Sequence, residues 1–363
     1  MSTQEIVTKK KLVGQSKKEF LKAGYSLWNE NVKSNTFDFI AKKDILKDLR
    51  SYPQKIVTKV LVDLDLFKKQ ASIELQLISK LISGFPLLVA HSAAGKEIEK
   101  ATLYRRHSVS AISLKTLQLF FQYEKGSNTT KISKFAHRGG VFVNLSKEKF
   151  KTRRKRLELD MTILAKKVGI SRQSLYKYEK GESFPKIKYF KILSNILGDN
   201  LDIPLDILEN QFENISQHTL KDYKQPRSQL QKEVASYLAD KEFNVLWFKS
   251  EPFDGLSEPN TDQSTANIQL DTLYPMITGV TSLNERSDSN RLLLINSLSG
   301  FLQKKAIWFL DDEDNIENLE PSKESSLLTL VKISDLEGMA LIDFKNMLNK
   351  KRYPEVLRET KND

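Results

Sequence analysis

The chain has 363 residues, enough for two or three domains of ordinary size. Hydrophobic residues make up 39% of it and charged residues 29%, a balance that is typical of globular protein and excludes a disordered composition. No segment reaches the ~18 apolar residues of a membrane span, the N-terminus lacks the apolar core of a signal peptide, and there is no cysteine. We therefore expect a cytoplasmic protein without disulfides, thiolate zinc sites or a membrane partner.

The net charge of +12 is distributed unevenly along the chain. Residues 1–145 carry +13, residues 146–219 carry +5, and residues 220–363 carry −6. Within the middle segment, residues 146–191 hold fifteen basic and five acidic side chains. Such an excess on a short helical stretch attracts polyanions through counterion release, although a solvated basic surface would look the same. The four histidines show no metal-ligand spacing, so we expect no metal and no cofactor.

The first 125 residues alternate between helical and strand-like segments, which predicts an α/β domain at 1–125. In chain order, the segments are a helix at Ser16–Ala23, the strand FDFIA with Asp38, an apolar strand at 56–62, an amphipathic helix containing Ser83–Phe85, a buried strand at 86–90, and Val109–Ser113 before a last helix. We expect a linker at 126–145 that contains the strand VFVNL.

The segment that begins at Ser146 predicts three short helices with a common apolar core. The apolar positions at helical spacing are Phe150, Leu157, Leu164, Ala165 and Val168. Asp160 is placed to cap the N-terminus of the second helix, Gly169 to end it, and Ser171 to cap the third. The third helix is expected at Arg172–Lys180, before Gly181. Two short helices joined by a glycine-containing turn form a helix-turn-helix, which we place in a domain at 146–212.

The run LDMTILAKKVGISRQSLYKYEKGESFP resembles the Cro/C1 (Xre-type) helix-turn-helix family. In that family the start of the third helix reads base edges in the major groove. The resemblance implies that Arg172, Gln173 and Lys177 read bases, and their side chains suit guanine and adenine edges. It also implies phosphate contacts from Lys166, Lys167, Ser174, Tyr176 and Lys180.

The same resemblance implies a structural ion pair between Arg154 of the first helix and Glu179 of the third. We expect this pair to be partly buried and to orient the third helix. Leu175 and Tyr178 are expected to face the core. Met161 departs from the family, which often places a phosphate-contacting Gln at that position.

The segments that follow the helix-turn-helix repeat the order of the first domain and predict a second α/β domain at 220–350. In chain order they are a helix at Gln229–Ala239, the strand NVLW before Asp254, a strand at 276–281, a helix containing Ser299–Phe301, a strand at 306–310, and Val331–Ser334 before a last helix. The alternative is a chance similarity between two α/β units.

The order of these segments resembles the restriction-endonuclease-like fold. Its enzymes hold Mg²⁺ with an Asp on one strand and an acidic-x-Lys triplet on the next. In the first domain Asp38 and Lys59 fit two of these positions, but Val57 stands where the triplet needs a carboxylate. Asp63 and Asp65 lie near the end of that strand and could substitute, or could be ordinary turn residues.

In the second domain Asp254 fits the first position, whereas Ile277 and Gly279 replace the triplet. We therefore predict no catalytic residue, no metal site and no enzymatic activity. The expected fold class is a central all-α Cro/C1-type helix-turn-helix flanked by two similar, inactive α/β domains.

Nearly the whole chain also resembles a family of archaeal helix-turn-helix transcriptional regulators, including Arg138-Gly139-Gly140 and the strand before the first helix. The function expected is that of a transcriptional regulator that binds double-stranded DNA sequence-specifically, as a homodimer on two half-sites. The alternatives are a coactivator-like adaptor, which would contact the transcription machinery, and a Mg²⁺-dependent nuclease tethered to DNA.

Overall fold

The computed structural model describes nine segments of the chain: residues 8–28, 36–43, 55–124, 131–208, 217–249, 253–259, 275–281, 286–311 and 327–349. The chain divides into two compact units. Unit 1 comprises Met1–Leu27, Lys43–Ser72 and Phe85–Gln211, and unit 2 comprises Trp28–Lys42, Ile73–Gly84 and Phe212–Asp363. In the described segments, no helix is long and apolar enough to cross a membrane. Residues 126–130 of the predicted linker and 209–212 of the predicted helix-turn-helix domain lie outside the description.

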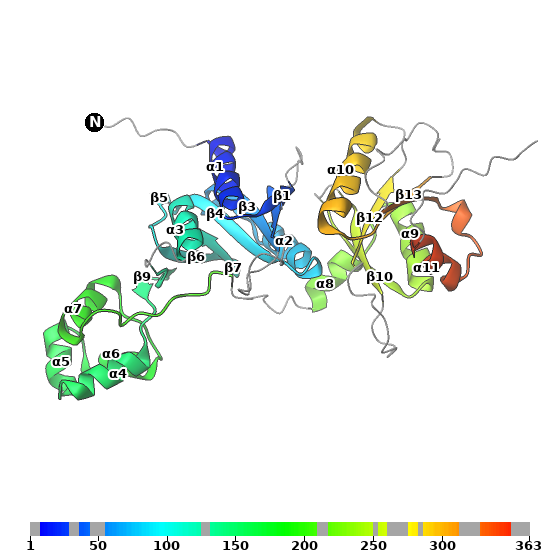
Figure 1. The fold of residues 1–363 in the computed structure, drawn as a ribbon. Helices are drawn as coiled ribbons and strands as arrows, with labels where there is room; N and C mark the ends of the chain where they lie inside the picture. The colour runs from blue at the N-terminus through cyan, green and yellow to red at the C-terminus, as the bar shows by residue number, and fades with distance from the viewer. Residues whose placement is uncertain are drawn as a thin grey trace, which may run out of the picture. The chain divides into compact units, whose positions relative to one another are not determined.

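Unit 1 is built on a sheet whose centre consists of three parallel strands, β3 (Lys55–Asp63), β4 (Phe85–Ala93) and β7 (Val109–Ile112). Most of their residues are buried, as expected for parallel strands that are covered on both faces. Helices α1 (Lys9–Lys22) and α3 (Leu114–Glu124) pack on this sheet and against each other (Figure 1). The rings of Phe20 and Phe121 meet edge to face between the two helices, with centroids 5.1 Å apart.

Four shorter strands extend this sheet, and three of them lead towards the helix-turn-helix. They are β5 (Lys96–Glu97), β6 (Thr102–Arg106), β8 (Lys134–His137) and β9 (Gly140–Val143). β5 pairs with β4, while the order β7-β6-β8-β9 carries the sheet outwards. β6 runs parallel to β8, and β8 and β9 form an antiparallel hairpin.

The helix-turn-helix region follows β9 directly and contains four helices, α4 (Lys147–Arg156), α5 (Met161–Val168), α6 (Arg172–Lys180) and α7 (Ile187–Leu197). Figure 1 shows them as a separate green bundle. Its core is a cluster of buried apolar side chains that includes Phe150, Leu164, Leu175 and Leu193. A single bridge between Phe142 and Lys186 ties the bundle to β9, and a second, between Leu145 and Asp202, joins the residues just after β9 to the segment after α7.

Unit 2 contains a five-stranded sheet in the order β10-β11-β12-β13-β14. The strands are β10 (Phe243–Trp247), β11 (Gly255–Pro259), β12 (Met276–Thr281), β13 (Ala306–Leu310) and β14 (Leu328–Lys332). β12, β13 and β14 run parallel, while β10, β11 and β12 are antiparallel neighbours. The sheet's helices are α8 (Gln217–Lys224), α9 (Gln229–Asp240), α10 (Arg286–Leu302) and α11 (Leu341–Asn349).

Unit 2 also includes two short stretches from the N-terminal part of the chain. These stretches contain β2 (Phe39–Lys42) and most of α2 (Lys69–Leu81). The first stretch begins at Trp28, which is the last residue of β1 (Ser26–Trp28). Within this unit the Trp28 indole donates to Ser297 Oγ at 3.0 Å. Glu74 is buried and accepts hydrogen bonds from Thr36 Oγ1 at 3.0 Å and from the Tyr223 hydroxyl at 3.4 Å. The Trp28–Ser297 and Glu74–Tyr223 bonds join residues 269 and 149 positions apart.

Two expectations about local structure are wrong. Leu157 is 45% exposed and lies outside the core, because α4 ends there and Glu158 turns the chain with a φ of 51°. Ser83–Phe85 does not lie within a helix, because α2 ends at Leu81 and Ser83 adopts a left-handed φ of 54°. The corresponding triplet at Ser299–Phe301 does lie within a helix, α10.

Candidate nucleic-acid interface

The ends of α5 and α6 are set by local hydrogen bonds and glycines. Asp160 Oδ1 accepts from the amides of Thr162 at 2.6 Å and Ile163 at 3.3 Å, and these bonds hold the pKa of the carboxyl below its usual range. Ser171 Oγ accepts from the amide of Ser174 at 3.0 Å. Gly169 ends α5 with a φ of 76°, a left-handed conformation that costs glycine little. The turn between the two helices is therefore specified by its own sequence.

One face of α6 is fixed in the core of the bundle. Leu175 and Tyr178 are buried there beside Leu164 and Val168 of α5. Burial in this apolar setting raises the pKa of the Tyr178 phenol. Because residues three apart lie on the same face of a helix, burial of this pair leaves the opposite face of α6 directed outwards.

The three side chains that, according to the family resemblance, read bases lie on the outward face of α6. Arg172, Gln173 and Lys177 are all exposed. Gln173 and Lys177 are four residues apart and lie one helical turn from each other on one face, and Arg172 is in the first turn beside them. The structure therefore brings the three together on one short, exposed surface.

The residues implied for phosphate contacts lie in two places. Tyr176 and Lys180 are on α6, and the Lys180 ammonium lies 5.4 Å from the centre of the Tyr176 ring. Lys166 and Lys167 are exposed in the last turn of α5. Ser174 is half-buried, and its hydroxyl lies 2.9 Å from Ser171 Oγ at the N-terminus of α6, so it takes part in capping.

Arg154 and Glu179 form a two-bond ion pair between α4 and α6. The Arg154 Nε atom is 2.7 Å from Glu179 Oε2 and its Nη2 atom is 3.0 Å from Oε1. The side chains are only 15% and 13% exposed. The hydrogen bond and charge of Glu179 raise the pKa of Arg154 against the opposing effect of burial. Arg154 Nη1 also donates to Leu159 O at 3.0 Å, so one guanidinium joins both helices and the turn that follows α4.

Replacing Arg154 by Met is expected to reduce the local stability of α6 by about 2 kcal/mol, because it leaves the Glu179 carboxylate without its counter-charge. The double variant Arg154→Met/Glu179→Leu is expected to recover part of this loss, since neither charge then remains. Amide hydrogen exchange in α6 measures both changes. A double variant that is less stable than Arg154→Met alone would contradict this account.

Arg153 has a structural role that the local sequence did not indicate. Its Nη1 atom donates to Leu197 O at 3.3 Å and to Asp199 O, so it covers the carbonyl end of α7. Basic side chains commonly stabilise helix C-termini in this way. Here the side chain belongs to a different helix, α4, and Leu197 of α7 lies 44 positions further along the chain. Local sequence patterns do not reveal such a partner.

The carboxylates expected near the first α/β sheet are engaged in turn contacts. Asp63 accepts from the amide of Asp65 at 2.8 Å and from Ser92 Oγ at 2.9 Å, and these bonds lower the pKa of its carboxyl. Asp65 accepts from the amide of Ala94 at 2.8 Å and lies 3.3 Å from Arg106 Nη1. Among the described residues, no group of three or more His, Asp and Glu side chains is arranged to hold a metal ion.

Three other positions compared with nuclease active sites lie in or beside the strands β2 and β3. Asp38 is half-buried and directly precedes β2. In β3, Lys59 is 5% exposed and Val57 is completely buried, so the position where a triplet needs a carboxylate packs in the apolar core.

In unit 2, Asp254 is held by protein groups on several sides. It accepts from the amide of Val280 at 2.7 Å and from Arg291 Nη2 at 2.9 Å, and more weakly from the Gln231 amide at 3.4 Å. Burial raises the pKa of the Asp254 carboxyl, while the charge of Arg291 opposes this rise. The Arg291 guanidinium in turn lies 5.6 Å from the centre of the Trp308 ring.

Trp308 also occupies the space beside Gly279, one of the two residues that replace the triplet. The two residues are partners in the β12–β13 register, and a Cβ on Gly279 would lie only 2.3 Å from Trp308 Cε3. Trp308 is completely buried. The sheet at this position therefore has no room for any side chain larger than hydrogen.

Replacing Arg291 by Met is expected to reduce the free energy of unfolding by about 2 kcal/mol at pH 7.5 and by clearly less at pH 5. Burial already raises the pKa of Asp254, and removal of Arg291 raises it further. Between the unfolded and folded pKa values, a falling pH protonates the folded carboxyl and removes the uncompensated charge. Urea denaturation at the two pH values measures the difference.

The matched control for this variant is Lys232→Met, which removes an exposed positive charge from α9 of the same unit. It is expected to change stability little at either pH. An equal loss for Arg291→Met at both pH values would show that the effect does not pass through Asp254.

Comparison with known proteins matches two parts of the chain to families. The PD-(D/E)XK superfamily domain matches residues 9–126, and the helix-turn-helix family matches residues 153–202. A protein of Pyrococcus furiosus named "Putative HTH-type transcriptional regulatory protein" is 25% identical over 80% of this chain and 83% of its own length. A protein of the same name from Methanocaldococcus jannaschii is 26% identical over 88% of this chain and 90% of its own length. No solved structure gives a significant match.

These matches agree with the geometry of α4 to α7 and with the resemblance seen in the sequence. They cover both the α/β region that precedes the bundle and the bundle itself. Residues 153–202 form a helix-turn-helix of the Cro/C1 type, in a chain that is similar over most of its length to archaeal proteins named as HTH-type transcriptional regulators.

Proposed function

We propose that this protein is a transcriptional regulator that binds double-stranded DNA sequence-specifically, with α6 in the major groove. The observation that carries the proposal is the outward face of α6, on which Arg172, Gln173 and Lys177 are exposed together. The opposite face is buried, and the Arg154–Glu179 pair fixes the helix in the bundle. A rigidly held helix with an exposed end rich in hydrogen-bond donors is what base readout requires.

Each side chain has a definite role in this proposal. Arg172 and Lys177 donate to guanine O6 and N7, and Gln173 pairs with adenine N6 and N7. The phosphate contacts come from Lys166, Lys167, Ser174, Tyr176 and Lys180. The reading domain extends over 146–212, between α/β domains at 1–125 and 220–350 and after a linker at 126–145.

A single helix-turn-helix of this size reads only a short half-site, so we propose that the protein acts as a homodimer on two half-sites about one helical turn apart. The acidic C-terminal region, with its charge of −6, would be repelled by the phosphates and remain away from the DNA. Light scattering at micromolar concentration, with and without DNA, tests this: a monomer under both conditions would exclude the dimer.

Selection of genomic fragments by the full chain at ~150 mM salt, followed by titration of the best fragment, tests the function. An inverted repeat bound ~10³-fold more tightly than random duplex is the expected result. Binding without an enriched motif would favour an adaptor that contacts the transcription machinery.

The match of residues 9–126 to the PD-(D/E)XK superfamily favours a nuclease as a second candidate function. We propose that this domain is inactive, since Val57 is apolar and buried where the triplet needs a carboxylate. Incubation of duplex DNA with Mg²⁺ or Mn²⁺ tests the proposal. Cleavage that disappears in Asp38→Ala would establish the nuclease.

We also propose that the second α/β domain repeats the first and is inactive. In both, three neighbouring strands are parallel, β3-β4-β7 and β12-β13-β14, and a helix lies between the first two in the chain. A further helix precedes each set and another follows it. In the second domain, Arg291 pairs with the Asp254 carboxylate that a metal ion would need, and Trp308 fills the space at Gly279.

A further inference from the structure

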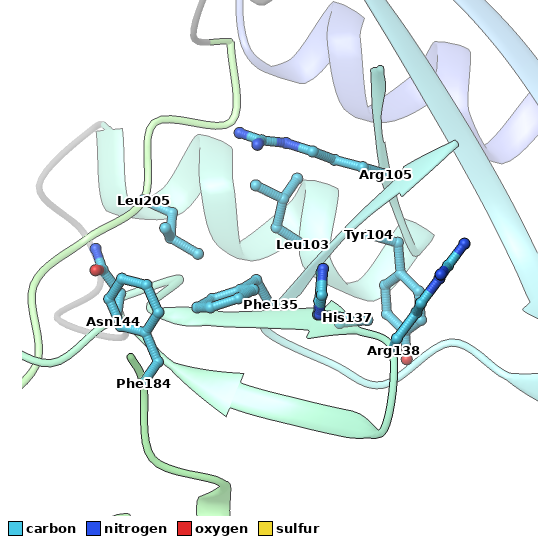
Figure 2. A pocket seen from close by; sticks show the side chains of 10 residues that line it. Leu103, Tyr104, Arg105, Phe135, His137, Arg138, Asn144, Phe184 and Leu205 are labelled. Atoms are coloured by element: carbon cyan, nitrogen blue, oxygen red, sulfur yellow. The ribbon is translucent and has the colours of Figure 1, made fainter. Parts of the chain in front are cut away.

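Unit 1 contains a cavity of about 620 Å³ beside the helix-turn-helix, which none of the roles above uses. Its volume lies within the range of small-molecule binding sites, about 300–1,000 Å³. Figure 2 shows that its lining comes from β6, the β8–β9 hairpin, the loop after α6 and the segment that follows the bundle.

The walls of this cavity are held together by backbone hydrogen bonds. Val143 N donates to Pro185 O at 3.0 Å, which joins β9 to the loop after α6. Leu205 N donates to Ile132 O at 2.8 Å, which joins the segment after the bundle to the residues before β8. The cavity is thus built from β6, from the loop after α6, and from the segments that directly precede and follow the bundle.

The chemistry of the lining is divided between apolar and cationic side chains. Leu103, Phe135, Phe184 and Leu205 supply apolar surface, and the rings of Phe135 and Phe184 meet at 90° with centroids 5.2 Å apart. Arg105 and Arg138 supply positive charge and His137 supplies a further polar group, all at exposed positions, as Figure 2 shows around the apolar group. None of the ten lining residues is acidic.

We propose that this cavity binds a small amphipathic anion, with an alkyl or aromatic body and a carboxylate or similar head group. The body would contact Phe135 and Phe184, and the head would lie at the Arg105 or the Arg138 guanidinium, which point to opposite sides of the apolar group in Figure 2. An apolar pocket with a few polar groups is the usual form of a ligand site, and guanidinium groups suit carboxylates in particular.

The position of Phe184 connects the cavity to the helix-turn-helix. Phe184 follows the left-handed Gly181, which ends α6, by only three residues. A ligand that packs on Phe184 and on the hairpin residue Phe135 would change how firmly the end of α6 is held. The proposal deepens the proposed function, on which it rests, because it makes the ligand a regulator of DNA binding.

The first test needs no DNA. The full chain is titrated with the fluorescent anion 1-anilinonaphthalene-8-sulfonate, and decanoate and decan-1-ol are compared as displacing ligands. Saturable binding of one probe per chain is expected, with displacement by decanoate at least about tenfold more effective than by decanol. No saturable binding, or equal displacement by the alcohol, would overturn the proposal.

Three variants assign the binding to this cavity. Arg105→Ala/Arg138→Ala is expected to weaken probe binding at least about tenfold, and Leu205→Trp is expected to abolish it by filling the space. The control Lys68→Ala/Lys69→Ala removes the same charge from exposed positions outside the lining and should leave binding unchanged. Equal probe binding by all variants would show that the probe lies elsewhere.

The second test repeats the DNA titration with and without saturating decanoate. A change in duplex affinity of about fivefold or more, absent in Leu205→Trp, is the expected coupling. Ligand binding without any change in DNA affinity would overturn the regulatory role and leave the DNA reader intact. Absence of DNA binding in every condition would instead contradict the proposed function, while the probe experiment would still stand.

Discussion

Replacement of both Arg172 and Lys177 by alanine is expected to weaken binding to the best natural duplex by about 100- to 1,000-fold. Each side chain is exposed on the outward face of α6, and a good contact with a base edge contributes about 1–3 kcal/mol of discrimination. Affinity for random duplex should fall far less, because there the two side chains contribute charge alone. Titration of both duplexes at one salt concentration gives the comparison.

Two further variants separate base reading from general attraction. Lys166→Ala/Lys167→Ala removes two exposed charges from α5 and should weaken the specific and random duplexes to similar extents. Lys68→Ala/Lys69→Ala removes two charges from the start of α2 and should change neither. If Arg172→Ala/Lys177→Ala lowered both affinities equally, α6 would not be the base reader.

The substitution Gly279→Ala is expected to reduce the free energy of unfolding by about 3 kcal/mol. The new Cβ would lie 2.3 Å from Trp308 Cε3, and Trp308 is completely buried in the centre of the sheet, so its ring has no free space to move into. Urea denaturation followed by tryptophan fluorescence measures the loss.

The control is a glycine in open surroundings. Gly14 lies within α1 and is exposed, with no other group near the position of a Cβ. Gly14→Ala should therefore stabilise the chain by about 0.5–1 kcal/mol. The double variant Gly279→Ala/Trp308→Leu should lose less stability than the two separate losses added together. A Gly279→Ala variant as stable as the native chain would remove the steric argument.

The helix-turn-helix could be predicted from the sequence in detail because the residues that set the ends of its helices act on nearby backbone groups. Asp160, Gly169 and Ser171 each act on backbone groups within four residues, and the structure shows α6 at Arg172–Lys180, the predicted bounds. The parallel strands were recognisable for a similar reason, since their apolar runs lie between helices in a regular order.

Features that depend on distant partners could not be predicted in this way. The space beside Gly279 is filled by Trp308, and the counter-charge of Asp254 is Arg291, 37 residues away. The cavity beside the bundle requires β6, the β8–β9 hairpin and Leu205 to meet, although a stretch of about 100 residues separates the first from the last. Apolar spacing also misplaced Leu157, because the spacing does not show where a helix ends.

The two chain segments that lead into and out of the bundle run side by side. Ser146 N donates to Leu201 O at 2.8 Å, and Ile203 N donates to Asn144 O at 3.0 Å. Segments whose ends lie this close together tolerate insertion and removal well. The helix-turn-helix is therefore joined to the sheet of unit 1 as a cassette, and recombination could exchange it for another such bundle while the sheet remained in place.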